Sequence, residues 1–247
     1  MKTIIKTFIT LAAITLMFAS CNKADDKKNT MYQAIVTVEN PDSTTTFYLK
    51  TENQLRLFTK TTSFIPANGS RLFVYFTIVE EMPEGSNYDY EVALQGYEDI
   101  LTKEIFNITP EAQDSIGNDP IEISNLWIAS NYLTVEFMVY RSNLPISHYI
   151  NLVADSSKHY DDSAVHLELR HNARNDYPDF RSFSLASFNL LPLKENAEGD
   201  SITLVIHSKE YVNSEKDRTI VYKFSSELNQ TRKFDNNYIF PSSAMIK

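Results

Sequence analysis

Apolar and polar residues alternate with a period of two along nearly the whole chain from Met31 onward. This is the spacing of a β-strand with one buried face, and the β-branched and aromatic residues that favour strands are frequent in it. No stretch of ten or more residues shows convincing helical spacing. The sequence therefore predicts an all-β protein.

The first part of this region predicts a small β-barrel over residues 31–106. Arg71 to Val79 is apolar on both faces, as expected of a strand in a closed barrel or a covered sheet. Gly96 interrupts a long strand pattern, where a glycine typically marks a bulge or a sharp bend at a barrel corner. Short, strongly bent strands suit a small barrel, and we expect them at 31–38, 45–51, 55–60, 71–79 and 88–103.

Proline, glycine and acidic residues crowd together between residues 107 and 120, and this composition predicts a linker between two domains. Beyond it, alternating segments recur at short intervals and predict a β-sandwich over residues 121–241. The expected strands of the sandwich are 121–128, 132–141, 148–154, 164–171, 180–190, 201–209 and 218–225.

The N-terminus has the order of a bacterial lipoprotein signal peptide over residues 1–20. Lys2 and Lys6 precede an apolar run from Phe8 to Phe18, and two small residues then precede Cys21. The run is shorter than the roughly twenty residues that cross a bilayer. We therefore expect Cys21 to become the first residue and to carry fatty acyl chains such as palmitate, which hold the protein at a membrane.

Residues 21–30 are polar and predict a flexible tether. The acidic residues just after Cys21 resemble the tag that directs lipoproteins of Bacteroides-type bacteria to the outer face of the outer membrane, although a charged tether explains them equally well. We expect an outer-membrane lipoprotein, either periplasmic or exposed on the cell surface.

Charge and cysteine content exclude several functions. The formal net charge is −9, and it becomes more negative once the two lysines of the signal peptide are removed. An excess of acidic side chains disfavours nucleic acid and anionic lipid as partners. With the only cysteine acylated, disulfides, thiolate metal sites and cysteine catalysis are excluded.

Several segments, taken in order, resemble NigD-like lipoproteins of Bacteroides-group bacteria. They are Ile100-Leu101-Thr102-Lys103, Asp119-Pro120 with Glu122-Ile123, Trp127 with Tyr132-Leu133-Thr134, residues 167–173 and Ala186-Ser187-Phe188-Asn189-Leu190. The resemblance covers essentially the whole mature chain. It implies an N-terminal OB-like barrel and a C-terminal β-sandwich, and it assigns no molecular function.

One strand carries a cluster of polar candidates for binding. Glu168 and Arg170 fall on the same face as His166, whereas His171 falls on the other face and Asn172 follows at the strand end. Arg170 could clamp an anion, but a salt-bridged outer face of a sheet is the commoner explanation. His171 and Asn172 lie where the loops of a sandwich often carry function, although a buried histidine that fixes a turn is again commoner.

Three aromatic residues of the barrel, Tyr48, Phe73 and Tyr75, predict a second candidate site. OB barrels use such residues as stacking platforms for bases or sugars, and the acidity of this chain favours a neutral glycan over nucleic acid. The alternative is that the three residues pack in the barrel core.

We expect no metal, cofactor or catalytic site. His159, Asp161, Asp162 and His166 could be imagined as metal ligands, but a solvated polar loop explains the acids. The chain has no nucleophile elbow, phosphate loop or dinucleotide-binding motif.

The sequence therefore favours a non-enzymatic envelope lipoprotein that binds a protein or peptide through loops or strand edges. An accessory or immunity role beside a bacteriocin is compatible with the family name. A glycan-binding module is the alternative, and a hydrolase on the rim of the sandwich is a weaker one.

Overall fold

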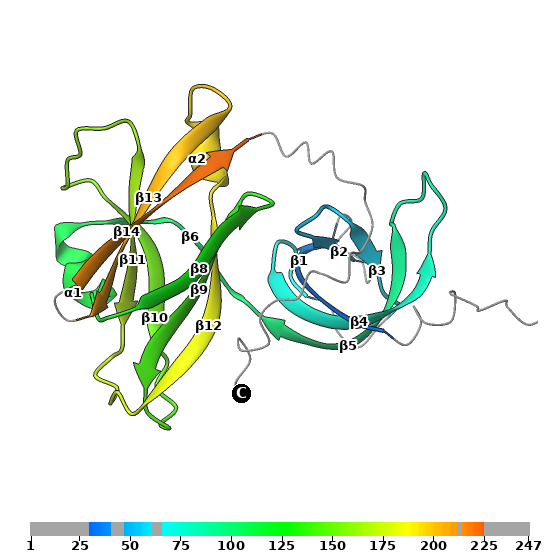
Figure 1. Cartoon of the computed structure of the whole chain (residues 1–247), viewed down its shortest axis with the longest axis horizontal. Coiled ribbons are helices and arrows are strands. Elements are labelled where there is room, and N and C mark those ends of the chain that lie inside the picture. The colour runs from blue at the N-terminus through cyan, green and yellow to red at the C-terminus, as the bar shows by residue number, and fades with distance from the viewer. Residues whose placement is uncertain (1–29, 41–46, 61–65, 212–213, 225–247) are drawn as a thin grey trace, which may run out of the picture.

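The computed structural model describes residues 30–40, 47–60, 66–211 and 214–224, which form two lobes joined side by side (Figure 1). The predicted signal peptide and the lipidation site Cys21 lie outside the described residues, as does the tether up to residue 29. In the part of the chain that is described, no helix is long and apolar enough to cross a membrane.

The first lobe is a closed five-stranded barrel with the strand order β1-β2-β3-β5-β4. Strands β3 and β5 pair in parallel, whereas the other neighbours are antiparallel. Its core holds the inward-facing side chains of every strand, among them Val36, Leu49, Leu57 and Phe76. The strands are β1 Met31–Glu39, β2 Tyr48–Thr51, β3 Arg56–Phe58, β4 Arg71–Glu81 and β5 Tyr90–Asp99.

The predicted irregularity at Gly96 is confirmed. Tyr75 on β4 pairs with Gly96, but the next residue, Phe76, pairs with Leu94, so that Gln95 is an extra residue on β5. A Cβ atom at position 96 would lie 3.7 Å from the ring of Tyr75. The bulge thus bends β5 alongside β4.

The second lobe is a sandwich of two sheets that pack face to face (Figure 1). One sheet has the order β14-β13-β11-β10-β7 and the other has the order β6-β12-β9-β8. The seven strands expected from alternation are present as β8 to β14. The nine strands are β6 Leu101–Glu104, β7 Phe106–Ile108, β8 Glu122–Ala129, β9 Tyr132–Arg141, β10 Tyr149–Asp155, β11 Val165–Asn172, β12 Phe180–Asn189, β13 Ser201–Tyr211 and β14 Ser214–Lys223.

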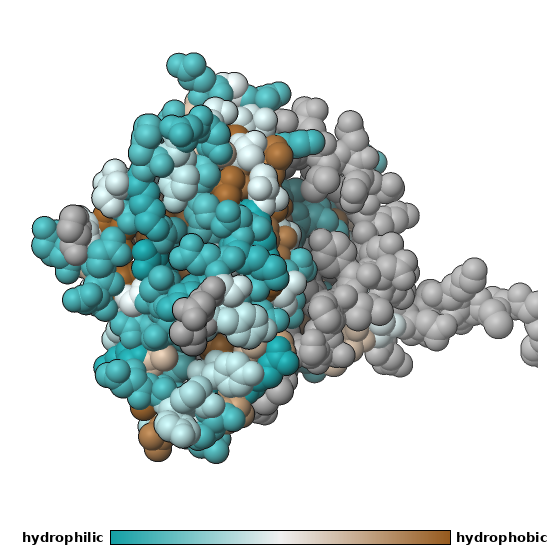
Figure 2. Space-filling model, turned by 60° about the vertical axis from the view of Figure 1, so that its left-hand side comes forward, coloured by the Kyte–Doolittle hydropathy of each residue, from teal (hydrophilic) through white to brown (hydrophobic). Residues whose placement is uncertain are grey.

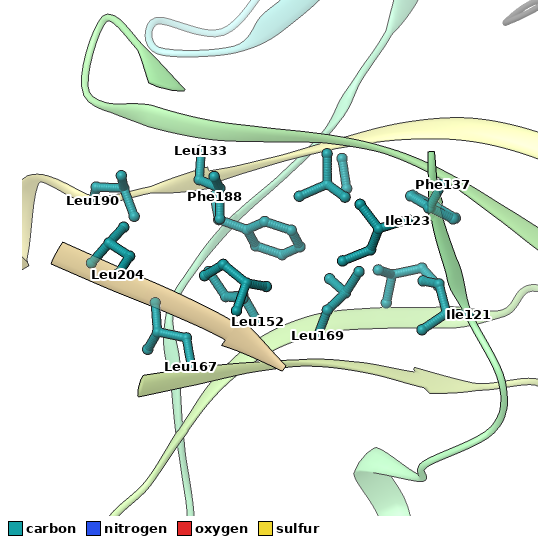
Figure 3. Close-up of a cluster of buried hydrophobic side chains, with 14 of the residues drawn as sticks. Ile121, Ile123, Leu133, Phe137, Leu152, Leu167, Leu169, Phe188, Leu190 and Leu204 are labelled. Atoms are coloured by element: carbon teal, nitrogen blue, oxygen red, sulfur yellow. The ribbon is translucent and has the colours of Figure 1, made fainter. Parts of the chain in front are cut away.

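The core of the sandwich is built from the alternating apolar positions that both sheets turn inward. Leu133 and Phe188 from one sheet point toward Leu152, Leu167 and Leu169 from the other (Figure 3). All five side chains are buried, four of them completely. This apolar layer is what fixes the two sheets against each other.

The structure corrects the predicted domain boundary. The expected strand 88–103 divides at Ile100, and its second part, β6, pairs with β12 of the sandwich instead of continuing the barrel. The predicted linker is also folded: β7 pairs with β10, and two short helical turns, η1 Pro110–Ala112 and α1 Gln113–Ile116, follow it. The sequence did not predict these elements, because each has only three or four residues and most of the segment is polar.

A buried ion pair joins the two lobes at a surface that we call the junction. The side chain of Arg71 on β4 has no exposed surface and donates to a carboxylate oxygen of Glu52 at 2.6 Å. Trp127 of the sandwich donates its indole N–H to the same carboxylate at 3.1 Å. Arg71 also donates to the hydroxyl oxygens of Thr134 and Ser187, at 3.1 and 3.3 Å.

Apolar residues complete the junction. Ile35, Phe73 and Ile100 form a buried cluster, against which Tyr75, Trp127 and Leu185 pack. Because barrel and sandwich both contribute to this cluster and to the ion pair, the junction holds the lobes in one arrangement.

Candidate functional site

Two loops at one end of the sandwich are tied together by Asp176; we call this end, formed by residues 140–149 and 173–180, the rim. Ser142 donates to Asp176 twice, through its backbone N–H at 2.9 Å and through its hydroxyl at 2.5 Å. The Asp176 side chain has no exposed surface although its loop is largely exposed. These hydrogen bonds from Ser142 hold the pKa of Asp176 well below its usual range.

Two histidines extend this network into the sandwich. His148 Nε2 lies 3.0 Å from a carboxylate oxygen of Asp176, and His148 Nδ1 lies 2.9 Å from Nε2 of His171. His171 Nδ1 in turn lies 2.9 Å from the carbonyl oxygen of Pro120. Burial lowers the pKa of His171, so this ring is neutral and donates its Nδ1 proton to Pro120.

His148 thereby links the exposed loop to the core of the sandwich. One ring nitrogen contacts Asp176 of the loop 173–180, and the other contacts His171 on β11. Since Ser142 of the other loop also donates to Asp176, the two loops are held through one carboxylate.

The rim displays a group of large apolar side chains on these fixed loops. Tyr177 is 71% exposed and Leu144 is 58% exposed, and three further residues add to the group: Tyr140, Tyr149 and Phe180. Hydrophilic residues predominate on the sandwich in Figure 2, and apolar surface is visible in several places, one of them the lower end where the rim loops lie in Figure 1. Tyrosines held on pre-ordered loops are typical of protein-binding surfaces.

The polar candidates Glu168 and Arg170 form a structural ion pair. Arg170 Nε lies 2.6 Å from Glu168, and Lys158 Nζ lies 2.5 Å from the other carboxylate oxygen. Arg170 also donates to the carbonyl oxygen of Gly117, in the segment around α1. Both side chains are only 9% exposed, so Arg170 does not present a free anion clamp.

His171 belongs to the hydrogen-bond network of the rim, whereas Asn172 holds a neighbouring backbone segment in place. Asn172 donates to the carbonyl oxygen of Ser115 at 2.9 Å and so holds α1 against β11. Gly117 adopts a φ of +75°, and a Cβ atom there would lie 2.7 Å from the Asn172 side chain. Asn172 therefore positions backbone and is not part of the exposed rim.

The aromatic candidates do not form one platform. Phe73 is only 5% exposed and lies in the junction, with Tyr75 beside it at a ring-centroid distance of 5.3 Å. Tyr48 instead packs against Phe58 and Tyr88 on the barrel. The predicted platform failed because alternation cannot tell a face covered by the second lobe from one open to solvent.

The residues considered as metal ligands are dispersed within the described ranges. His159 and Asp161 are almost fully exposed, whereas Asp162 lies 2.8 Å from His166. No group of three or more His, Cys, Asp or Glu that could hold a metal occurs among the described residues. At the rim, Ser142 directs its hydroxyl proton to Asp176, whereas a serine nucleophile directs it to a histidine base.

Both lobes match domains of one family. The NigD-like N-terminal OB domain matches residues 35–100, and the NigD-like C-terminal beta sandwich domain matches residues 104–222. This chain belongs to the NigD-like family. No curated protein matches it.

Solved structures of Bacteroidales proteins share the NigD-like fold. A protein of unknown function from Bacteroides vulgatus is 25% identical, with a TM-score of 0.64 over 84% of this chain and 97% of its own. A NigD-like immunity protein from Bacteroides caccae is 17% identical, with a TM-score of 0.54 over 78% and 97% of the two chains. A candidate lipoprotein from Bacteroides fragilis is 13% identical, with a TM-score of 0.55 over 80% and 100%.

Sequence reasoning missed most of the rim of this NigD-like chain. Ser142, Leu144, His148, Asp176 and Tyr177 lie in two polar segments without strand alternation. Asp176-Tyr177-Pro178 was the available signal, since an exposed aromatic residue between turn-forming residues is unusual in a solvated loop.

Proposed function

We propose that this NigD-like chain is a non-enzymatic, lipid-anchored protein of the cell envelope that binds a protein partner through the rim of its sandwich. The observation that carries the proposal is the group of exposed tyrosines and apolar side chains on loops that a buried hydrogen-bond network holds still. Pre-ordered loops reduce the entropy lost on binding, and tyrosine is enriched among the residues that dominate binding energy.

The family supports a non-enzymatic accessory role. One neighbour is named as an immunity protein and another as a candidate lipoprotein. An immunity-type function requires recognition of another protein and no chemical step. The outer-membrane location and the lipid at Cys21 are part of this proposal, and the order of signals in residues 1–21 supports them.

The binding surface is tested by photo-crosslinking in cell envelopes. A crosslinking amino acid at position 177 should capture one reproducible protein, and the same residue at position 97 is the matched control, because Tyr97 is also an exposed tyrosine but lies on the barrel. Leu144→Ala combined with Tyr177→Ala should abolish the adduct formed from a crosslinker at position 140. Equal capture from positions 177 and 97, or no adduct in any growth condition, would contradict the proposal.

The anchor is tested separately. Cys21→Ala should move the protein from the membrane fraction to the soluble fraction, and the native protein should have an acylated Cys21 as its first residue by mass spectrometry. An intact Met1 or a free thiol at position 21 would contradict the lipid anchor but would leave the proposal for binding at the rim unaffected.

A second candidate function is glycan binding by the barrel, and a specific cluster supports it. Tyr48 on β2, Phe58 on β3 and Tyr88 before β5 are half-buried, and the ring centroids of Phe58 and Tyr88 are 4.9 Å apart. OB barrels commonly bind ligands on the β2–β3 face and the neighbouring loops. Soluble glycans should quench intrinsic fluorescence or bind by calorimetry, and Tyr88→Ala should weaken that binding; a glycan panel without any binder would end this alternative.

A further inference from the structure

A second pair of histidines lies away from the rim, on the outer face of the five-stranded sheet. His166 on β11 and His207 on β13 face each other, with Nδ1 of His166 2.9 Å from Nε2 of His207. The ring planes are nearly parallel, since they differ by 15°, and the ring centroids are 5.1 Å apart. The two nitrogens are therefore within hydrogen-bond distance of each other.

Each outer nitrogen of this pair faces a carboxylate. His166 Nε2 lies 2.8 Å from Asp162, and His207 Nδ1 lies 2.6 Å from Asp217. Carboxylates that are ionised only accept, so both outer nitrogens carry protons. If both rings were neutral, two lone pairs would then meet at 2.9 Å, which is a repulsive contact.

A single cation between the rings, either a metal ion or a proton, removes this repulsion. The distance between the two inner nitrogens decides between these two cations. A zinc ion binds each nitrogen at about 2.0 to 2.1 Å with tetrahedral angles, so two nitrogens on one zinc ion would be roughly 3.3 Å apart. The observed 2.9 Å is the length of an N–H···N hydrogen bond. The two rings therefore share three N–H protons, one more than two neutral imidazoles hold.

The surroundings favour this extra positive charge. Tyr160 stacks face to face on His166, with ring centroids 3.6 Å apart and planes 5° apart, so its ring face meets the charged pair. Lys158 is paired with Glu168, and Lys209 is turned toward the carbonyl oxygen of Asn118. The titratable groups that contact the pair are Tyr160 and Asp162 from the β10–β11 connection and Asp217 from β14. Lys158, Glu168 and Asp155 lie close enough to Tyr160 to influence its pKa.

We propose that the His166–His207 pair binds one proton that latches the β10–β11 connection, residues 156–164, onto the outer face of the sheet. The connection is held by Asp162 and Tyr160, which both contact His166. Loss of the shared proton restores the repulsion between the rings, and the connection then separates from the sheet. Lys158, Tyr160 and Asp162 of the connection line a cavity of about 260 Å³ together with His166, and this cavity should widen when the connection separates.

The proton itself is tested by nitrogen NMR of histidine side chains in the whole mature protein. At about pH 7, the pair should show both outer nitrogens protonated and a shared proton between the inner ones. Two neutral tautomers at that pH, with no inner N–H, would overturn the proposal.

The latch is tested with trypsin, because Lys158 lies inside the connection. His207→Asn removes the shared proton, and it should make cleavage after Lys158 roughly tenfold faster than in the wild type. His159→Asn is the matched control, since it changes a solvent-exposed histidine of the same connection and should leave the rate unchanged. Equal rates in the two variants, with unchanged circular dichroism, would contradict the latch; His166→Gln gives a second reading if His207→Asn fails to fold.

Discussion

The junction and the rim are both built around a buried carboxylate, yet they differ in what surrounds it. Glu52 at the junction is held by the guanidinium of Arg71 and the indole of Trp127, and it is only 7% exposed. Asp176 at the rim is held by a serine and by a histidine in exposed loops. The first network depends on donors that keep their protons, whereas the second passes through histidine rings, whose protonation changes near neutral pH.

This difference separates two tasks. A guanidinium, an indole and hydroxyls donate at every physiological pH, so the junction fixes the arrangement of the lobes permanently. A histidine donates from both nitrogens only while it is protonated. The rim is therefore ordered, but its order depends on pH.

The largest expected effect is at the junction. Arg71→Met leaves Glu52 buried without its charge partner, which should cost about 3–5 kcal/mol of unfolding free energy in urea titrations. Arg56→Met is the control, because Arg56 pairs with Glu39 at the surface with 44% of its side chain exposed, and it should cost at most about 1 kcal/mol. Similar costs for both variants would mean that the junction is no firmer than a surface ion pair.

A smaller effect is expected from the other donor to Glu52. Trp127→Phe keeps most of the apolar contact with Ile35 and Phe73 but removes the indole N–H, at a cost of about 1.5–3 kcal/mol. Thermal unfolding followed by circular dichroism should change from one transition toward two as the lobes uncouple. A single, unshifted transition would show that the indole bond does not couple the lobes.

Acid should loosen the rim before the junction. The pKa values of Asp176 and His171 are both lowered in the folded state, so the open rim takes up more protons than the closed one. The contribution of His171 is lost as the pH falls below about 6.5, and that of Asp176 is lost only below about pH 4. Hydrogen exchange should show residues 173–179 opening on acidification while residues 71–76 stay protected, and Asp176→Asn should remove the part below about pH 4.

The smallest effect on stability is expected for Tyr177 at the rim, although its replacement should strongly weaken binding of the proposed partner. Tyr177→Ala removes a side chain that is 71% exposed, so the unfolding free energy should change by no more than about 0.5 kcal/mol. A larger loss in a urea titration would mean that Tyr177 supports the loop instead of presenting a surface to a partner.

The fold was predictable wherever apolar and polar residues alternate along a strand. Alternation located β8 to β14 and the five barrel strands, and Gly96 marked the bulge. The very short β6 and β7 were missed, because three or four residues carry no period, and their place is set by pairing with β12 and β10.

The candidate site was less accessible to sequence reasoning. His171 was predicted to lie near the end of a strand, where loops often carry function, but its partners His148 and Asp176 come from two other segments. Burial of Phe73 likewise depends on the second lobe, so no pattern within the barrel could show it.

Only Ile100 stands between the last barrel strand, β5, and the first sandwich strand, β6, and it is 7% exposed within the junction cluster. If the two domains were separated at this point, each would expose its apolar part of the junction, and the contacts that the sandwich makes with the Arg71–Glu52 pair would be lost. The two modules should therefore be inherited as one block, and neither is expected to recombine freely with foreign domains. For the same reason, a force applied at Met31 should be transmitted to the rim loops through a rigid body.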